Sequence, residues 1–144
     1  MRYFPITVAA VIAVGQLQVA ASIAAARRCL EYGPASVALT GTIVRRMEYG
    51  PPNYGEDPAH DAREVYWYLQ LHDPICVNGK KDTSEEMEEE TNVRKVQIVY
   101  PNGYPEGDHW INHRASITGI LFHAMTGHHH TKVLIEARKT SLRP

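Results

Sequence analysis

The sequence has no excess of charge of either sign. Its 15 Lys and Arg residues nearly balance 16 Asp and Glu residues, and the formal net charge is −1. A chain with this balance creates no overall field that would attract nucleic acid or an anionic membrane. We therefore expect no nucleic-acid partner. The 144 residues are enough for one domain with a single hydrophobic core.

A long apolar run suited to a permanent membrane span is also missing. The run at 6–14 is too short for one, and it is followed by many small residues and an Ala-x-Ala pattern that ends at Ala26. These features are typical of an export signal. We expect residues 1–26 to be a helical signal peptide and residues 27–144 to form a periplasmic or secreted bacterial domain with no stable membrane span. The alternative is an amphipathic or anchoring helix that stays attached.

Cysteine is scarce, because only Cys29 and Cys76 occur, and they form no CxxC redox motif. In a small exported domain, two thiols are more often paired than free. A disulfide between them would close a long loop and stabilise the fold by about 3–4 kcal/mol on the chain-entropy model. Two free thiols are the alternative.

Motifs for hydrolytic catalysis are missing as well. No serine lies in a GxSxG elbow, and no HExxH motif is present. Carboxylates such as Asp61 and Glu64 lie in or beside the Pro-rich stretch at 50–62, which lacks the rigid platform that sugar hydrolysis needs. We expect these carboxylates to keep a loop soluble, and we expect a protein without enzymatic activity.

The chain does contain short β-rich segments that alternate with turn-rich ones, at the spacing of an all-β domain. One helical turn is expected near Trp110, within the turn-rich connection that separates the third strand from the fourth. The five expected strands cover residues 36–50, 64–78, 93–101, 114–125 and 131–142.

The second of these segments is the strongest strand candidate. Strict alternation places Val65, Trp67 and Leu69 on one face, which we expect to join the core. Asp73 and Pro74 are expected to turn the chain before a short second run.

Two strands share a Thr-Gly pair in their middle, at Gly41 and at Gly119. A mid-strand glycine lets a strand coil or bulge where a side chain would clash. Five strands with a long third-to-fourth connection then predict a small OB-like barrel, named for folds that bind oligonucleotides and oligosaccharides. A β-sandwich with a similar number of strands is the alternative.

Histidine is concentrated in the segment 126–130, which reads TGHHH and has the composition of a β-hairpin loop. His123, His128 and His130 could share one side and bind Zn or Cu, the ions that imidazole ligands favour. The alternatives are a structural loop whose imidazoles form hydrogen bonds, and a loop that senses pH or contacts a partner.

Tyrosine is the second candidate for recognition. Tyr66 and Tyr68 face away from the expected core, and Tyr54 lies in the GPPNY loop. Together with His129 they could form a surface that contacts a ligand, because aromatic rings stack on bases or sugars. A single-stranded nucleic acid would also need a cationic groove, which the balanced charge does not predict.

Several stretches carry a resemblance to a known family. CLEYGPASVALTGTIVRR, YWYLQLHDPICVN and above all TGILFHAMTGHHHTKVLI are similar to the domain-of-unknown-function family 4431, a family of small exported bacterial domains. The resemblance covers nearly all of residues 29–137. It implies export, a β-rich domain and a Cys29–Cys76 pair, and it implies no reaction.

Taken together, the sequence predicts an exported, non-enzymatic binding module for a protein or small ligand of unknown identity. One alternative is an inhibitor or immunity-type protein that blocks a toxin or cell-wall enzyme and uses the acidic stretch at 85–90. A metal-dependent hydrolase is the other alternative.

Overall fold

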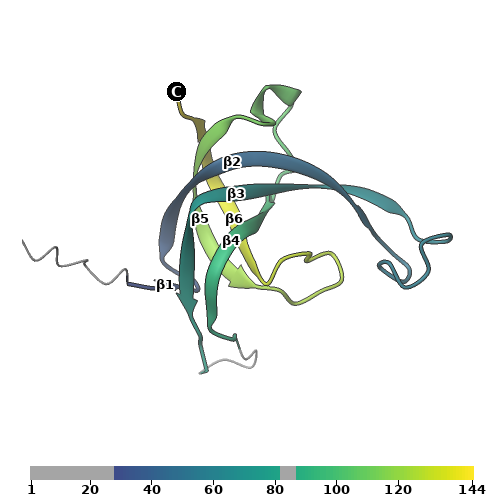
Figure 1. Cartoon of the computed structure of the whole chain (residues 1–144), viewed down its shortest axis with the longest axis horizontal. Helices are drawn as coiled ribbons and strands as arrows, with labels where there is room; N and C mark the ends of the chain where they lie inside the picture. Colours follow the sequence, from purple (N-terminus) through teal and green to yellow (C-terminus); the bar gives the residue numbers. More distant parts are fainter. Residues whose placement is uncertain (1–27, 82–86) are drawn as a thin grey trace, which may run out of the picture.

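The computed structural model describes residues 28–81 and 87–144, and these residues are mostly β (Figure 1). All five predicted strands are present, and a short 3-10 helix occupies the place of the predicted helical turn. The predicted signal peptide lies outside the described residues, among which no helix is long and apolar enough to cross a membrane. The elements are β1 (Leu30–Glu31), β2 (Ser36–Tyr49), β3 (Arg63–Asn78), β4 (Glu90–Val99), η1 (Asp108–Trp110), β5 (Arg114–His123) and β6 (Val133–Leu142).

The five long strands pair in a closed cycle. β2 pairs with β3 and with β5, β3 pairs with β4, and β5 pairs with β6, all of them antiparallel. A parallel pairing of β4 with β6 closes the cycle. Within this cycle each long strand has a hydrogen-bonded neighbour on both sides along part of its length, so the cycle itself has no free strand edge.

The two mid-strand glycines lie where a neighbouring backbone comes close. A Cβ atom on Gly41 would be 2.3 Å from the Gln70 carbonyl oxygen, and one on Gly119 would be 2.2 Å from the Glu136 carbonyl oxygen. The pairing register of β5 with β6 also shifts between Thr118 and Gly119. The predicted reason for these glycines, a place where any side chain would clash, is confirmed.

The predicted turn at Asp73 and Pro74 is wrong, because β3 continues through both residues to Asn78. The register of β3 against β4 shifts instead, between Gln70 and Ile75 and again between Ile75 and Val77. Proline removes one donor from the hydrogen-bond ladder but keeps an extended backbone, so it produces an irregularity in the pairing here and not the end of the strand.

The core fills the inside of the ring of strands. Trp67 is 5% exposed and belongs to this core, as predicted. Val65 does not, because it lies on the part of β3 that extends beyond the core with β2, and it is 45% exposed.

A second buried layer lies on the outside of the same strands. Three residues on these strands are almost fully buried, and so are the residues directly before and after each of them. They are Tyr68, Gln97 and Leu134. Successive residues of a strand point to opposite faces, so continuous burial means that both faces are covered here. The cover includes the β5–β6 loop, whose contacts position the candidate site.

The predicted disulfide is present and joins Cys29 to Cys76 of β3. It ties the start of the described chain to the ring of strands beside the parallel pairing of β1 with β3, where Leu30 lies opposite Val77.

Candidate functional site

Two loops meet on one side of the ring of strands. The β2–β3 connection carries Tyr54 and the β5–β6 connection carries the three histidines, and both extend to the same side in Figure 1. The Tyr54 ring packs edge-on against the His128 ring, with centroids 5.2 Å apart. A Cβ atom on Gly127 would lie 2.8 Å from the Tyr54 ring, so glycine provides the space for this contact. The two loops therefore form one continuous surface.

His128 is the centre of a hydrogen-bond network that joins both loops to β3. Its Nδ1 atom lies 2.9 Å from the Tyr66 hydroxyl and 3.2 Å from Glu64 Oε2, and its Nε2 atom lies 3.2 Å from the Tyr54 hydroxyl. The Tyr66 hydroxyl donates its own proton to Glu64 Oε2. Nδ1–H is therefore the donor toward Tyr66 and Glu64, and in the neutral ring Nε2 accepts from Tyr54.

The protonation states of Glu64 and Tyr66 follow from this network. The hydrogen bond from Tyr66 lowers the pKa of Glu64 below its usual value of 4.5; burial opposes this effect, and the contacts with His128 add to it. Burial raises the pKa of Tyr66 far above its usual value of 10.0, and the Glu64 carboxylate raises it further. At neutral pH Glu64 is an anion and Tyr66 is a neutral donor, so the pair forms a fixed link between β3 and the β5–β6 loop.

Gln97 of β4 holds the backbone of the β5–β6 loop against the outside of the strands. Its side chain is buried, with Nε2 donating to the His128 carbonyl oxygen at 2.9 Å and Oε1 accepting from the His130 N–H at 2.7 Å. The Gln97 backbone N–H also donates to Thr131 Oγ1 at 2.9 Å. Three hydrogen bonds to one residue thus fix the path of the loop.

His129 stabilises the loop from within. Its Nδ1 atom accepts a hydrogen bond from the Met125 N–H at 2.8 Å, and its ring packs edge-on against Phe122. Burial lowers the pKa of His129, and the charges of His128 and His130 lower it further. The ring is therefore neutral near pH 7 and keeps the lone pair that this hydrogen bond requires.

A cleft of about 210 Å³ opens beside the network, where β3 and β4 diverge beyond the Trp67–Ile98 pair. Tyr104 is 39% exposed and stacks on Trp67, with ring centroids 5.0 Å apart and planes inclined by 22°. Among the described residues that line the cleft, none is Lys or Arg. Aromatic rings dominate the lining, which includes Tyr66, Tyr100, Tyr104, His128 and His129.

Three of the four residues predicted to bind a ligand lie at this surface, namely Tyr54, Tyr66 and His129. Tyr68 does not, since it is fully buried and its hydroxyl donates to Glu48 Oε1 at 2.8 Å. Tyr68 therefore links β3 to β2 through Glu48, and its ring does not reach solvent.

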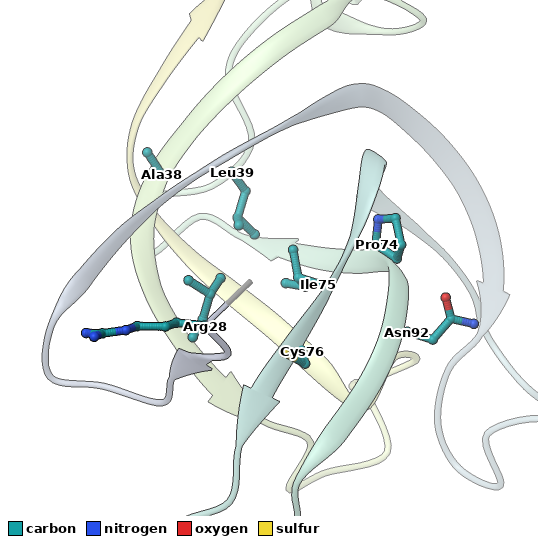
Figure 2. Close-up of a pocket in the computed structure, with 8 residues that line it drawn as sticks. Arg28, Ala38, Leu39, Pro74, Ile75, Cys76 and Asn92 are labelled. Carbon is teal, nitrogen blue, oxygen red and sulfur yellow. The ribbon is translucent and has the colours of Figure 1, made fainter. Parts of the chain in front are cut away.

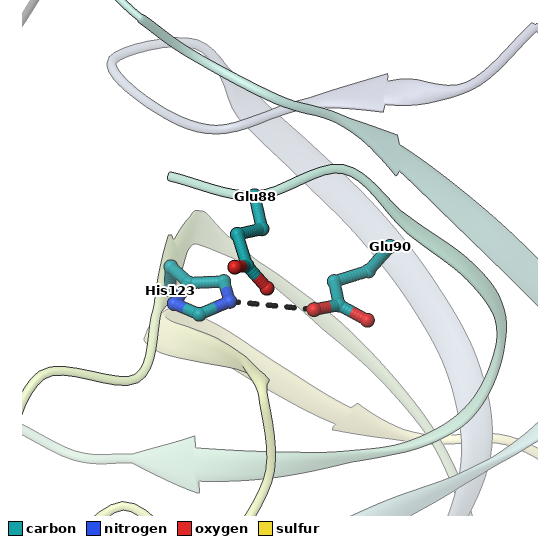
Figure 3. Close-up of side chains that lie close together, drawn as sticks. All are labelled: Glu88, Glu90 and His123. Atoms are coloured by element: carbon teal, nitrogen blue, oxygen red, sulfur yellow. Dashed lines mark hydrogen bonds and ion pairs between the residues drawn. The ribbon is translucent and has the colours of Figure 1, made fainter. Parts of the chain in front are cut away.

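Of the three histidines predicted as metal ligands, His128 and His130 both contact Tyr66, whereas His123 lies apart from them. His128 joins the network with Tyr54, and the His130 ring packs against Tyr66, with centroids 4.7 Å apart. His123 instead lies with Glu88 and Glu90, as Figure 3 shows. Within the described parts of the chain, this is the group in which three potential ligand atoms lie within 4.8 Å of one another.

Sequence reasoning missed the roles of Glu64 and Gln97 and the stacking of Tyr104 on Trp67. Glu64 was expected to serve loop solubility, but it is the second residue of β3 and shares a face with Tyr66, two positions further on. The spacing of two residues between Glu64 and Tyr66 could have indicated that their side chains lie on the same face of the strand. The signal for Gln97 was a polar residue inside an apolar strand. Tyr104 is one of several tyrosines near the loops, but its contact with Trp67 is formed by the tertiary structure and could not be predicted.

A larger cavity of about 390 Å³ lies beside the disulfide (Figure 2). Its lining is mainly apolar and includes Leu39, Pro74 and Ile75, with Arg28 as its charged residue. It brings together no set of acids, bases or hydrogen-bonding groups, so we place the candidate site at the smaller cleft with its network of hydrogen-bonding groups.

The comparison with curated proteins gave no match, and the comparison with solved structures gave none either. One family model matches residues 95–139, which run from the middle of β4 through the β5–β6 loop to β6 and include Gln97 and all three loop histidines. The family is described as "Domain of unknown function (DUF4431)". The match over residues 95–139 confirms the predicted resemblance to this family.

Proposed function

We propose that this protein is an exported binding module with an OB-like arrangement of strands that recognises a neutral sugar unit at the cleft beside His128. The observation that carries the proposal is the convergence of two loops, through Tyr54 and His128, next to a cleft lined by tyrosines. Such convergence gives a ligand a surface that is already formed before binding.

The order of pairing supports the OB-like arrangement. In that fold, five strands close partly on themselves, and ligands bind on the face of the second and third strands between the first-to-second and fourth-to-fifth loops. The corresponding elements here are β3 and β4, the β2–β3 connection and the β5–β6 connection. The tyrosine cleft occupies this position.

The chemistry of the cleft favours a sugar over a nucleic acid. Phosphates require cationic partners, whereas this lining offers tyrosine rings, imidazoles and, next to them, the Glu64 carboxylate. Rings stack on the faces of sugars, and hydroxyl, imidazole and carboxylate groups bond their hydroxyls. A cleft of about 210 Å³ is smaller than the ~300–1,000 Å³ of pockets for drug-sized ligands, so one ring fits better than several.

Export is supported by the disulfide and by the predicted signal peptide. A Cys29–Cys76 bond persists in an oxidising compartment such as the periplasm. The inhibitor alternative has less support, because Glu90 of the acidic stretch is buried and lies 3.1 Å from Lys132 Nζ.

Calorimetric titration of the full, oxidised chain with a panel of neutral oligosaccharides tests the proposal, with a single-stranded oligonucleotide as the comparison. Tyr104→Ala should weaken sugar binding about 5- to 150-fold, the loss expected when one stacking ring is removed. Tyr66→Phe keeps the ring but removes the hydroxyl and should have a smaller effect. Met47→Ala, a change at an exposed side chain of β2 outside the cleft, is the matched control and should change nothing.

Three results would contradict the proposal. The first is the absence of binding to every sugar in the panel, and the second is tighter binding of the oligonucleotide. The third is a sugar affinity that Tyr104→Ala leaves unchanged, because the ligand would then lie elsewhere on the chain.

A further inference from the structure

A second cluster of chemistry-bearing side chains lies apart from the tyrosine cleft. His123 ends β5, Glu90 begins β4, and Glu88 lies just before it in the chain. Figure 3 shows the three side chains directed toward one another, and their potential ligand atoms lie within 4.8 Å. The His123 and Glu90 side chains are only 17% and 11% exposed. Glu88 is exposed, which leaves a path to solvent.

The His123 ring is oriented as a metal ligand would be. Its Nδ1 atom lies 3.2 Å from the Ala124 carbonyl oxygen, and because a carbonyl can only accept, Nδ1 carries the proton. In the neutral ring, the Nε2 lone pair then faces Glu90 Oε1 at 3.4 Å. A proton on Nε2 or a metal ion bound by both atoms would satisfy this pair. Histidines that bind metals usually donate their other N–H to a carbonyl or carboxylate in this way.

The spacing of the donor atoms suits zinc. Zinc binds histidine nitrogen at about 2.0–2.1 Å and carboxylate oxygen at about 2.0–2.2 Å, so neighbouring ligands of a tetrahedral ion lie about 3.3–3.5 Å apart. The observed 3.4 Å between His123 Nε2 and Glu90 Oε1 falls in that range. Calcium and magnesium favour all-oxygen sites, which an imidazole ligand does not offer.

Tyr32 supplies an independent observation at the same place. Its ring packs edge-on against His123, with centroids 5.9 Å apart, and the residue is 3% exposed. Its hydroxyl is buried and makes no hydrogen bond within the described residues. Burial, followed by the charges of Glu90 and Glu88, raises the pKa of Tyr32 to about 12, so the hydroxyl keeps its proton at neutral pH. A buried hydroxyl without a partner is costly unless something bonds it.

Lys132 is the cation that faces the cluster in the structure. Its Nζ atom lies 3.1 Å from Glu90 Oε1, and its side chain is 69% exposed. This long side chain can turn into solvent, where water hydrates its ammonium group, when a metal ion takes its place beside the buried Glu90 carboxylate. Lys132 therefore competes with a metal ion for Glu90 without blocking it.

We propose that Glu88, Glu90 and His123 bind one zinc ion, with the Tyr32 hydroxyl as a hydrogen-bonding neighbour of the bound ion's shell. The site joins the start of β4 to the end of β5, so the ion ties two strands that do not pair with each other. It does not include the loop histidines His128 and His130.

Calorimetric titration of the full chain with zinc chloride, after treatment with a chelator, tests the site. One zinc ion should bind per chain, and millimolar calcium or magnesium should not compete. His123→Gln and Glu88→Gln should each weaken zinc binding at least tenfold. Lys132→Met should strengthen it about two- to fivefold, because the competing cation is gone. His72→Gln, at an exposed histidine of β3, is the matched control and should bind as the parent chain does.

The fold of each variant is checked by near-ultraviolet circular dichroism, and Glu88→Gln, at an exposed side chain, keeps the test valid even if His123→Gln unfolds. Zinc affinity that survives Glu88→Gln unchanged would overturn the site. So would binding that His128→Gln abolishes, weaker binding in Lys132→Met, or the absence of any zinc binding by the folded parent chain.

Discussion

Replacing Gln97 by Met tests whether the β5–β6 loop is held by the strands beneath it. Methionine has nearly the same length as glutamine, so it fills the buried space without making a cavity. It removes the donor to the His128 carbonyl oxygen and the acceptor for the His130 N–H. The change therefore isolates the two side-chain hydrogen bonds from packing.

The expected loss can be worked out from these two bonds. Each contributes a net of about 0.5–1.5 kcal/mol, and a buried group left without its partner costs more. Both bonds are only partly buried, so water can replace part of the loss. We expect the free energy of unfolding to fall by about 1–3 kcal/mol. Gln70→Met, at an exposed position of β3, is the matched control and should fall within ~0.5 kcal/mol of the parent chain.

Urea unfolding followed by tryptophan fluorescence gives the global value, and amide hydrogen exchange at His130 gives the local one. The His130 amide should exchange at least about tenfold faster in Gln97→Met than in the parent chain. A loss below about 0.5 kcal/mol together with unchanged exchange at His130 would refute the reasoning. The loop would then be held by contacts other than those to Gln97.

Three further predictions concern stability. Replacing Cys29 and Cys76 together by Ser should lower the free energy of unfolding by about 4 kcal/mol, because the bond spans 47 residues; a loss under ~1 kcal/mol in urea unfolding would contradict this. Gly119→Ala should cost about 1–3 kcal/mol or more through overlap with the Glu136 carbonyl, and an unchanged thermal midpoint would show that the strands can separate freely there. The lowered pKa of Glu64 makes its stabilising effect complete above pH 4.5, and this effect is lost as the pH falls through the folded-state pKa. The stability difference between the parent chain and Glu64→Gln should therefore shrink below pH 4.5, whereas a difference independent of pH between 3 and 6 would argue against the ionised network.

Much of the fold could be predicted from neighbouring residues. Alternation along 64–78 located β3 and placed Trp67 in the core, because residues two apart on a strand share a face. The Thr-Gly pairs located two positions of close backbone approach, since only glycine tolerates a carbonyl at 2.2–2.3 Å from its missing Cβ. The export pattern and two cysteines predicted the disulfide, which is formed.

The sites could be predicted only in part. The TGHHH loop and Tyr54 were identified as a contact surface from their composition, but the partners of His128, at positions 64 and 66, lie more than sixty residues away. Periodicity contains no information about such pairs. The same holds for His123, which was grouped with the loop histidines because it is near them in the chain and which lies instead beside Glu90.

By itself, then, the sequence determined the five long strands, the close-packed glycines and the covalent link, all of which depend on local side-chain chemistry. The tertiary structure alone decided which polar groups share a site. The parallel pairing of β4 with β6 places Gln97 under the histidine loop, and the extended β2–β3 hairpin places Tyr54 and Glu64 beside it. These contacts arise from the closure of the strand cycle, which depends on the whole set of pairings and not on any one segment.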